Sequence, residues 1–330
     1  MTRVAITGLG TYVPERILSN QDLERLVDTN DAWIRSRTGI LERRLARANE
    51  VTSDMALEAA QKALADAGLK AEQLDFIIVA TNTPDTIFPS TAARLEARLG
   101  EVTIPGIDVQ AGCTGWVYGL ELGAALIESG HYRRVLVVAS DKLSSIVDYE
   151  DRSTAVLFGD GAGAVVLEPA LPDSRAGILA TYVNADGRGA DLLALPAGGS
   201  RAPASRATVE RRLHFLKMSG NDVFRFAVKA LPEAVEMGLA KAGLALEAMD
   251  LLVPHQANER IIEAARRQLG LPEEKVVKNI ERYGNTSVAS IPLALEEVRR
   301  TGRLRDGTVA VLAAFGAGLT WGSVVVRWGR

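Results

Sequence analysis

The sequence predicts an α/β fold built from two similar halves. Strand patterns alternate with helix patterns along the whole chain, which is typical of α/β proteins. Apolar residues make up 47% of the 330 residues and charged residues 24%, as in globular proteins with a sizeable core. A pattern in the first half also returns in the second half. These three observations favour a duplicated α/β architecture.

The first half contains several predicted elements in order. Thr52 or Ser53 can cap a helix that Gly68 ends, and the apolar run 75–81 is typical of a buried central strand. Further strands are predicted at 135–140 and 163–168. Residues 169–174 contain two prolines and a change of composition, so we expect a boundary there, with halves 1–170 and 171–330.

The internal repeat is the strongest evidence for duplication. Residues 64–75 align without a gap on residues 239–250, each with a helix end, a glycine and the start of an apolar strand. Other matches follow in the same order: 163–167 with 322–326, Gly112-Cys113 with Gly284-Asn285, and Ser129-Gly130 with Thr301-Gly302. Pseudo-symmetric halves bring equivalent loops together at their interface, where sites are common. We therefore expect Cys113 to face Asn285.

Composition excludes several classes of function. A net charge of -3 gives no reason to expect nucleic acid or an acidic membrane surface as a partner. The single cysteine can form neither an internal disulfide nor a cysteine-rich zinc site, and we expect no metal. The first residues predict a strand and not a signal peptide, and no apolar run is long enough to span a bilayer. We therefore expect a cytoplasmic location.

Cys113 is the first candidate for chemistry. The run 104–109 predicts a strand, small residues surround the thiol, and a long apolar segment through Ile127 predicts a buried helix with Cys113 in its first turn. The positive end of a helix dipole favours thiolate, so we expect a lowered cysteine pKa. The alternative is a small buried thiol with a packing role only.

His255 and Asn285 are the candidates for partners of the cysteine. His255 ends the apolar strand 251–253, whereas His131 lies in a polar turn and His214 among basic and apolar residues. A neutral imidazole and a neutral amide are good donors to an oxyanion, and the glycine-rich stretch 315–320 could bring backbone N–H groups close. A buried structural histidine, a capping asparagine and a plain turn remain as alternatives.

These motifs resemble those of the thiolase superfamily, and more closely the 3-oxoacyl-[acyl-carrier-protein] synthase III family, which initiates type II fatty-acid synthesis. The resemblance covers essentially the whole chain and rests on four motifs: Ala111–Gly115, Pro254–Asn258, Gly284–Ser287 and Phe315–Gly322. It implies a duplicated αβαβα architecture of five layers and a homodimer.

The resemblance also implies a mechanism. Cys113 would take an acyl group, usually acetyl, from acyl-CoA, and malonyl-carrier-protein would then decarboxylate and attack the thioester. His255 and Asn285 would stabilise the enolate, and the backbone N–H groups of Cys113 and Ala317 would form the oxyanion hole. Acyl-CoA is a substrate, and no permanently bound cofactor is expected. The family more often has glycine where this chain has Ala317.

Further contacts are implied residue by residue. Trp33 and Arg152 match a pair that sandwiches the adenine of coenzyme A, and Phe88 resembles a residue that a partner subunit inserts into the acyl pocket. The remaining coenzyme-A contacts would be Thr29, Arg37, Asn221 and Asn258. The candidates for docking the acidic acyl carrier protein are Arg225, Arg260, Arg266 and Arg267. Arg260 and Arg267 lie seven residues apart and so on one helical face, for which a solvated basic face is the alternative.

Other activities remain open to different degrees. A biosynthetic thiolase needs a second cysteine, and elongating condensing enzymes use two active-site histidines, where this chain has Asn285. A related enzyme that condenses other acyl groups in secondary metabolism is a close alternative. From other classes, the candidates are a Cys–His thioester hydrolase and a non-catalytic acyl-CoA-binding protein.

Overall fold

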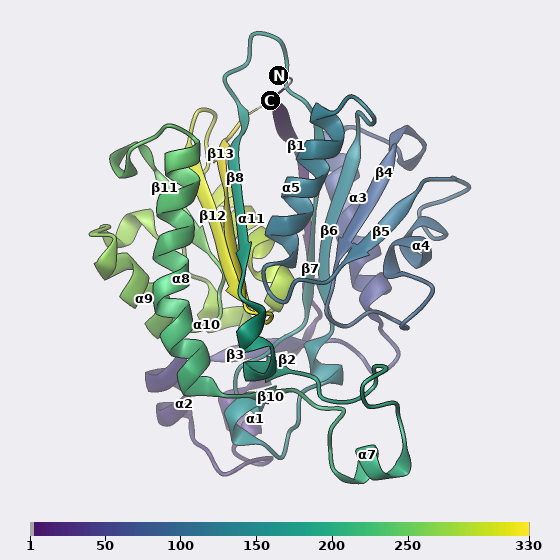
Figure 1. Ribbon diagram of the computed structural model, residues 1–330, viewed down its shortest axis with the longest axis vertical. Coiled ribbons are helices and arrows are strands. Elements are labelled where there is room, and N and C mark those ends of the chain that lie inside the picture. Colours follow the sequence, from purple (N-terminus) through teal and green to yellow (C-terminus); the bar gives the residue numbers. More distant parts are fainter. Residues whose placement is uncertain (1–2, 330) are drawn as a thin grey trace.

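The computed structural model describes residues 3–329, which form two main β-sheets and the helices that cover them (Figure 1). The first sheet has the strand order β1-β7-β6-β4-β5 and the second β8-β13-β12-β11. The strands of the first sheet are β1 (Val4–Tyr12), β4 (Phe76–Ala80), β5 (Gly106–Val109), β6 (Val135–Asp141) and β7 (Gly161–Pro169). Those of the second sheet are β8 (Gly177–Ala185), β11 (Leu251–Pro254), β12 (Val309–Gly316) and β13 (Thr320–Arg327).

The two sheets have the same topology. Antiparallel pairs join β1 to β7 and β7 to β6 in the first sheet, and β8 to β13 and β13 to β12 in the second. Parallel pairs follow in both, between β6 and β4 and between β12 and β11. β5 extends the first sheet in parallel, and Val276 forms a parallel bridge to Leu252 at the matching edge of the second. The predicted duplication is confirmed.

The helices complete five layers. Helices α5 (Gly115–Glu128) and α11 (Ser290–Arg300) lie between the two sheets, where their apolar residues share one core with both (Figure 1). Helices α3 (Thr52–Ala67) and α4 (Thr91–Glu96) cover the outer face of the first sheet. Helices α8 (Gly220–Lys241) and α9 (Glu259–Gln268) cover that of the second. The order is therefore αβαβα.

The central position of α5 explains its sequence. A helix that contacts a sheet on each side must be apolar around most of its circumference. Trp116, Leu120 and Ile127 are accordingly buried, and they pack in the core that both sheets share. None of the helices within residues 3–329 is long and apolar enough to cross a membrane.

Short elements gather at the end of the sheets that is lowest in Figure 1. Here β2 (Arg16–Ser19) pairs with β3 (Glu42–Leu45), and β9 (Leu193–Ala194) pairs with β10 (Lys217–Met218). The short helices are α1 (Asn20–Leu23), α2 (Asp31–Thr38), α6 (Arg152–Ala155), α7 (Arg206–Glu210) and α10 (Ile280–Tyr283). They surround the loops that leave β5 and β12, and these loops carry the candidate site.

Candidate active site

Cys113 lies in the turn between β5 and α5. The helix begins at Gly115 with Thr114 as its N-cap, so Cys113 stands one residue before the cap and not in the first helical turn as the sequence predicted. The residue is half-buried. Its sulfur accepts a hydrogen bond from the hydroxyl of Ser287, at a distance of 3.5 Å.

The predicted lowering of the cysteine pKa is wrong for this structure. Burial raises the pKa of the Cys113 thiol to about 12, and the hydrogen bond from Ser287 opposes this only in part. Loss of hydration penalises the thiolate, and the charge of Asp141 adds to this effect. At neutral pH the thiol is therefore protonated, and its proton must leave during attack on a substrate.

His255 is buried and neutral. Burial lowers the pKa of its imidazole to about 3, because an imidazolium would lose its hydration there. Nδ1 lies 2.6 Å from the hydroxyl of Ser290, and the ring packs edge-on against Phe315. Within residues 3–329, Nε2 has no hydrogen-bond partner, so this nitrogen is free to act on a ligand.

Asn285 is fixed through its oxygen. Oδ1 accepts a hydrogen bond of 2.8 Å from the backbone N–H of Ser287, which assigns the NH₂ group to the other side of the amide. Its backbone pairs with Leu157 and Gly159. It does not cap α11, whose N-cap is Ala289. The NH₂ group makes no hydrogen bond within residues 3–329 and remains available as a donor.

The structure brings these three side chains together. Cys113, His255 and Asn285 line one cavity of about 90 Å³, together with Phe224 of α8, Asn258 at the start of α9 and other, mostly apolar residues. They come from three separate loops: before α5, after β11 and between α10 and α11. A thiol and two neutral side chains that can donate hydrogen bonds therefore share one small space.

Two glycines allow the turn between β12 and β13 to pack closely against the loop of Cys113. A Cβ at Gly316 would lie 2.5 Å from the backbone nitrogen of Cys113, and a Cβ at Gly112 would lie 2.6 Å from that of Ala317. Gly112 also has a positive φ of 56°, which suits glycine. The backbones of Cys113 and Ala317 can therefore lie side by side, as a pair of oxyanion donors requires.

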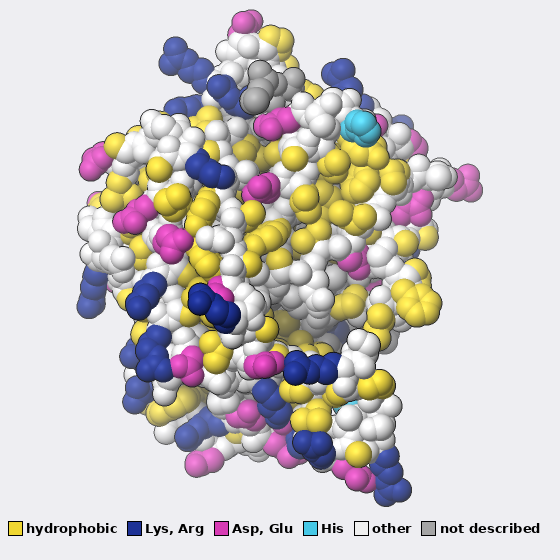
Figure 2. All heavy atoms as spheres, in the orientation of Figure 1, with side chains coloured by type: hydrophobic (Ala, Val, Ile, Leu, Met, Phe, Trp, Pro, Cys, Tyr) yellow, Lys and Arg dark blue, Asp and Glu magenta, His cyan; other side chains and the backbone are white. Residues whose placement is uncertain are grey.

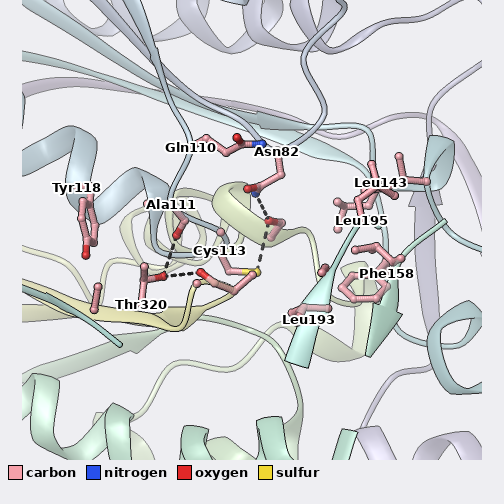
Figure 3. A pocket seen from close by; sticks show the side chains of 18 residues that line it. Asn82, Gln110, Ala111, Cys113, Tyr118, Leu143, Phe158, Leu193, Leu195 and Thr320 are labelled. Carbon is pink, nitrogen blue, oxygen red and sulfur yellow. Dashed lines mark hydrogen bonds between the residues drawn. The ribbon is translucent and has the colours of Figure 1, made fainter. Parts of the chain in front are cut away.

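A second cavity adjoins the first and shares Cys113, Phe158 and Leu193 with it. It has a volume of about 470 Å³, and leucines and a phenylalanine form one wall, whereas Tyr118 and Thr320 lie on the opposite side (Figure 3). The labelled apolar residues of that wall are Leu143, Phe158, Leu193 and Leu195. An apolar acyl chain attached to the sulfur fits such a space.

Trp33 and Arg152 also lie together, although they are far apart in sequence. The Arg152 guanidinium stands 5.0 Å from the centre of the Trp33 ring, and Arg152 donates to the Asp28 carbonyl. This spacing leaves no room for a third planar group between them, so an adenine would have to displace Arg152 from the ring.

Of the other predicted coenzyme-A contacts, Asn258 lines the cavity of His255 and Asn285. Asn258 caps α9 and donates from Nδ2 to the carbonyl of Arg37, so its side chain already has structural partners. Asn221 and the side chain of Arg37 are exposed, and Thr29 is half-buried. Arg37 and Asn258 are thus neighbours in space.

The predicted docking arginines differ in availability. Arg260 and Arg267 are exposed on α9, and Arg260 lies over the ring of Phe224. Arg225 is exposed and pairs with Asp222. Arg266, in contrast, is half-buried and bonded to Glu263 and to the Leu271 carbonyl, so it is occupied within its own helix end.

Phe88 is 84% exposed and lines neither of these cavities. Its neighbour Ile87 is exposed to the same degree, and both precede α4. Hydrophobic side chains also form a broad patch beside α5 and the strands next to it (Figure 2). Ile107 on the edge strand β5 and Leu122 on α5 are among the exposed apolar residues.

Sequence reasoning missed several polar residues around the sulfur and the imidazole. Asn82 and Asp141 stand at the ends of β4 and β6, and Ser287 and Ser290 lie beside Asn285. A search for polar residues directly after parallel strands would have found Asn82 and Asp141, because the carboxyl ends of such strands commonly carry sites.

A duplicated five-layer fold with a cysteine before its central helix, facing a histidine and an asparagine, defines a thiolase-fold condensing enzyme. The family model described as 3-oxoacyl-[acyl-carrier-protein (ACP)] synthase III matches residues 107–187, and its C-terminal counterpart matches 239–328. The chain belongs to the 3-oxoacyl-[acyl-carrier-protein] synthase III family, as the sequence motifs predicted.

Relatives support this over the full length. The chain is 51% identical to beta-ketoacyl-[acyl-carrier-protein] synthase III of Caldanaerobacter subterraneus subsp. tengcongensis, with 98% of each chain covered. It is 53% identical to the protein of the same name from Symbiobacterium thermophilum, covering 99% of this chain and 98% of that one. The crystal structure of 3-oxoacyl-(acyl carrier protein) synthase III from Pseudomonas aeruginosa PAO1 superposes with a TM-score of 0.91 at 45% identity, with 99% of each chain covered.

Proposed function

We propose that the protein condenses a short acyl-CoA, with acetyl-CoA as the first candidate, with malonyl-acyl-carrier-protein. The products are 3-oxoacyl-carrier-protein, coenzyme A and carbon dioxide. One observation carries the proposal: two cavities meet at Cys113, and one of them is also lined by His255 and Asn285, whereas leucines form part of the other. The first suits the reacting thioester groups and the second suits the acyl chain.

In the first half-reaction the sulfur of Cys113 attacks the acyl-CoA carbonyl carbon. The thiol proton passes through His255 to the sulfur of departing coenzyme A, because a buried imidazolium does not persist at a pKa of about 3. The backbone N–H groups of Cys113 and Ala317 stabilise the oxyanion. The result is an acyl thioester on Cys113 and free coenzyme A.

In the second half-reaction the malonyl thioester occupies the cavity of His255 and Asn285. Both donate hydrogen bonds to its carbonyl oxygen, so that loss of carbon dioxide leaves a stabilised enolate. The enolate carbon attacks the acyl group, and Cys113 leaves as thiolate and is then reprotonated.

Ser290 is suited to both half-reactions. A hydroxyl both donates and accepts hydrogen bonds, so Ser290 can pair with Nδ1 of either neutral tautomer of His255. When the hydroxyl donates to Nδ1, Nε2 carries the proton and becomes the donor that the enolate oxygen needs. In the other tautomer, Nε2 accepts the thiol proton.

The substrate contacts follow the same proposal. Trp33 and Arg152 would hold the adenine, with Thr29, Arg37, Asn221 and Asn258 along the rest of coenzyme A. Arg225, Arg260 and Arg267 would dock the acidic carrier protein, and Arg266 would support α9 instead. The protein would need no permanently bound cofactor and would work in the cytoplasm.

A homodimer would complete the acyl pocket. β5 is an edge strand with one unpaired side, and an unpaired edge beside exposed apolar residues favours pairing with another copy. Phe88 of the partner subunit would then enter the apolar cavity, which accounts for its exposure here.

Incubation with acetyl-CoA alone tests the proposal. We expect release of one coenzyme A and a stable acetyl group on Cys113, measured by intact mass. Cys113→Ala should reduce condensation at least about 1000-fold, as removal of a catalytic nucleophile does. Steady hydrolysis of acetyl-CoA would instead indicate a hydrolase, and binding without acylation would indicate an acyl-CoA-binding protein.

A further inference from the structure

A chain of hydrogen bonds leads from a buried carboxylate to the reactive sulfur. Asn82 donates from Nδ2 to Asp141 at 2.9 Å and to the hydroxyl of Ser287 at 3.1 Å. Ser287 in turn lies 3.5 Å from the sulfur of Cys113. Figure 3 shows the last two contacts as dashed lines that pass from Asn82 through a hydroxyl to Cys113.

The direction of these bonds follows from the available protons. Asp141 is fully buried and accepts from Thr81, from Thr83 and from both the backbone and the side chain of Asn82. A carboxylate with so many donors can only hold the NH₂ end of the Asn82 amide. That NH₂ group then donates to Ser287, whose single hydroxyl proton is left for the sulfur.

Ser287 is held in place by its backbone as well. Its N–H donates to Asn285, and its φ of 52° lies in the left-handed region that non-glycine residues seldom adopt. Such strain is found where the surroundings fix a residue for a function. The buried hydroxyl is therefore presented to Cys113 in one orientation.

We infer that Ser287 is a further catalytic residue, which donates a hydrogen bond to the sulfur of Cys113, and that Asn82, anchored by Asp141, is its positioning residue. The inference rests on the proposed role of Cys113 as the acylated nucleophile. Negative charge builds on the sulfur twice, when it attacks acyl-CoA and when it leaves the thioester. His255 carries the thiol proton and, with Asn285, binds the carbonyl oxygen of the malonyl thioester, whereas Ser287 stabilises the negative charge on the sulfur itself.

Alkylation by iodoacetamide tests this directly, because Cys113 is the only cysteine in the chain. A hydrogen bond from Ser287 stabilises the thiolate that reacts with iodoacetamide. Ser287→Ala should therefore slow alkylation at pH 8 about tenfold. The rise of the rate with pH should also move to higher pH. Ser323→Ala is the matched control and should leave the rate and its pH dependence unchanged, because within the described residues the buried Ser323 hydroxyl bonds only to the carbonyl of Ala234.

Asn82→Ala gives the second test, which applies even if Ser287→Ala fails to fold. Asp141 keeps its bonds from Thr81, Thr83 and the backbone of residue 82, and only the alignment of Ser287 is lost. We expect alkylation of Cys113 to slow in this variant too, but by less than in Ser287→Ala. If both variants were alkylated at the wild-type rate and with the wild-type pH profile, the inference would be wrong.

Malonyl decarboxylation separates a role on the sulfur from general damage. It uses His255 and Asn285 and places no charge on the sulfur, so Ser287→Ala should leave it near the wild-type rate. An equal loss of decarboxylation and alkylation would also overturn the inference. Failure of the proposed function would appear differently, as wild-type protein that alkylates normally but takes no acyl group from acyl-CoA.

Discussion

In the first half of the molecule, the loop before the central helix carries Cys113, and in the second half the equivalent loop carries Asn285. The loops after β4 and β11 show the same contrast, with Asn82 in one and His255 in the other. Asn82 serves the sulfur through Ser287, whereas His255 and Asn285 face the space for a carbonyl oxygen. Equivalent positions in the two halves therefore carry different side chains, which act on different atoms in the proposed mechanism.

The largest expected effect that tests this division comes from Asn285→Ala. The variant loses one of two donors to the enolate oxygen, so malonyl decarboxylation should fall about 100- to 1000-fold, the usual cost of one oxyanion donor. Acylation of Cys113 uses backbone donors and should fall much less, because Asn285 reaches the sulfur only indirectly, through the bond that its Oδ1 accepts from the Ser287 N–H. The two rates are measured separately, by release of carbon dioxide and by intact mass. Equal losses would contradict separate roles for the two halves.

Gly316→Ala should reverse that pattern. The added Cβ would lie 2.5 Å from the backbone nitrogen of Cys113, so the two loops must move apart and the proposed oxyanion hole is disturbed. We expect acylation by acetyl-CoA to slow about 100-fold. Gly199→Ala is the control, because a Cβ at Gly199 meets no atom within 4 Å. Normal acylation in Gly316→Ala would exclude this backbone contact from the mechanism.

The titration of the two halves should also differ. His255 has a pKa of about 3 in the folded protein against 6.5 as its ordinary value, so below pH 6.5 the unfolded state gains a proton that the folded state lacks. Stability therefore falls as the pH drops from 6.5 towards 3, by up to about 1.4 kcal/mol per pH unit. His255→Gln has no imidazole at this position, so this part of the pH dependence of stability is missing in the variant.

The measurement is the free energy of unfolding in urea at pH 7 and pH 4.5. The loss between the two pH values should be smaller in His255→Gln than in the wild type. The same loss in both proteins would mean that His255 is hydrated and charged in the folded state at low pH.

The smallest expected effect concerns Trp33, which lies outside the two loops that carry Cys113 and Asn285. Trp33→Ala should weaken use of acyl-CoA by about 1–3 kcal/mol, the worth of stacking a base on an aromatic ring. The Michaelis constant for acyl-CoA is the readout, and Trp33→Phe, which keeps a ring, should lose less. An unchanged constant in Trp33→Ala would remove this residue from the binding site.

Much of the fold could be predicted because the repeat consists of local sequence patterns. Glycine stops, caps and apolar strand runs recur at 64–75 and 239–250, and such signals survive without knowledge of the rest of the chain. Cys113, His255 and Asn285 could be proposed as candidates for the same reason, since each stands in a loop directly beside a predicted strand or helix.

The surroundings of the sulfur could not be predicted in this way. Asn82, Asp141 and Ser287 come from separate loops, and their roles depend on which way each short side chain donates. The pKa of Cys113 was predicted in the wrong direction because the sequence shows the helix start but not the depth of burial. The engagement of Arg266 by Glu263 likewise depends on a rotamer.

The close contact between the cysteine loop and the turn after β12 has a consequence for biosynthesis. Thr320 bonds to the carbonyl of Ala111, which lies 209 residues earlier in the chain. Loops this distant in sequence meet late, after most of the chain has been synthesised and folded. A nascent chain stalled after its first half thus displays the cysteine without its histidine, its asparagine or its second backbone donor. The reactive centre is assembled only when synthesis of the chain is nearly finished.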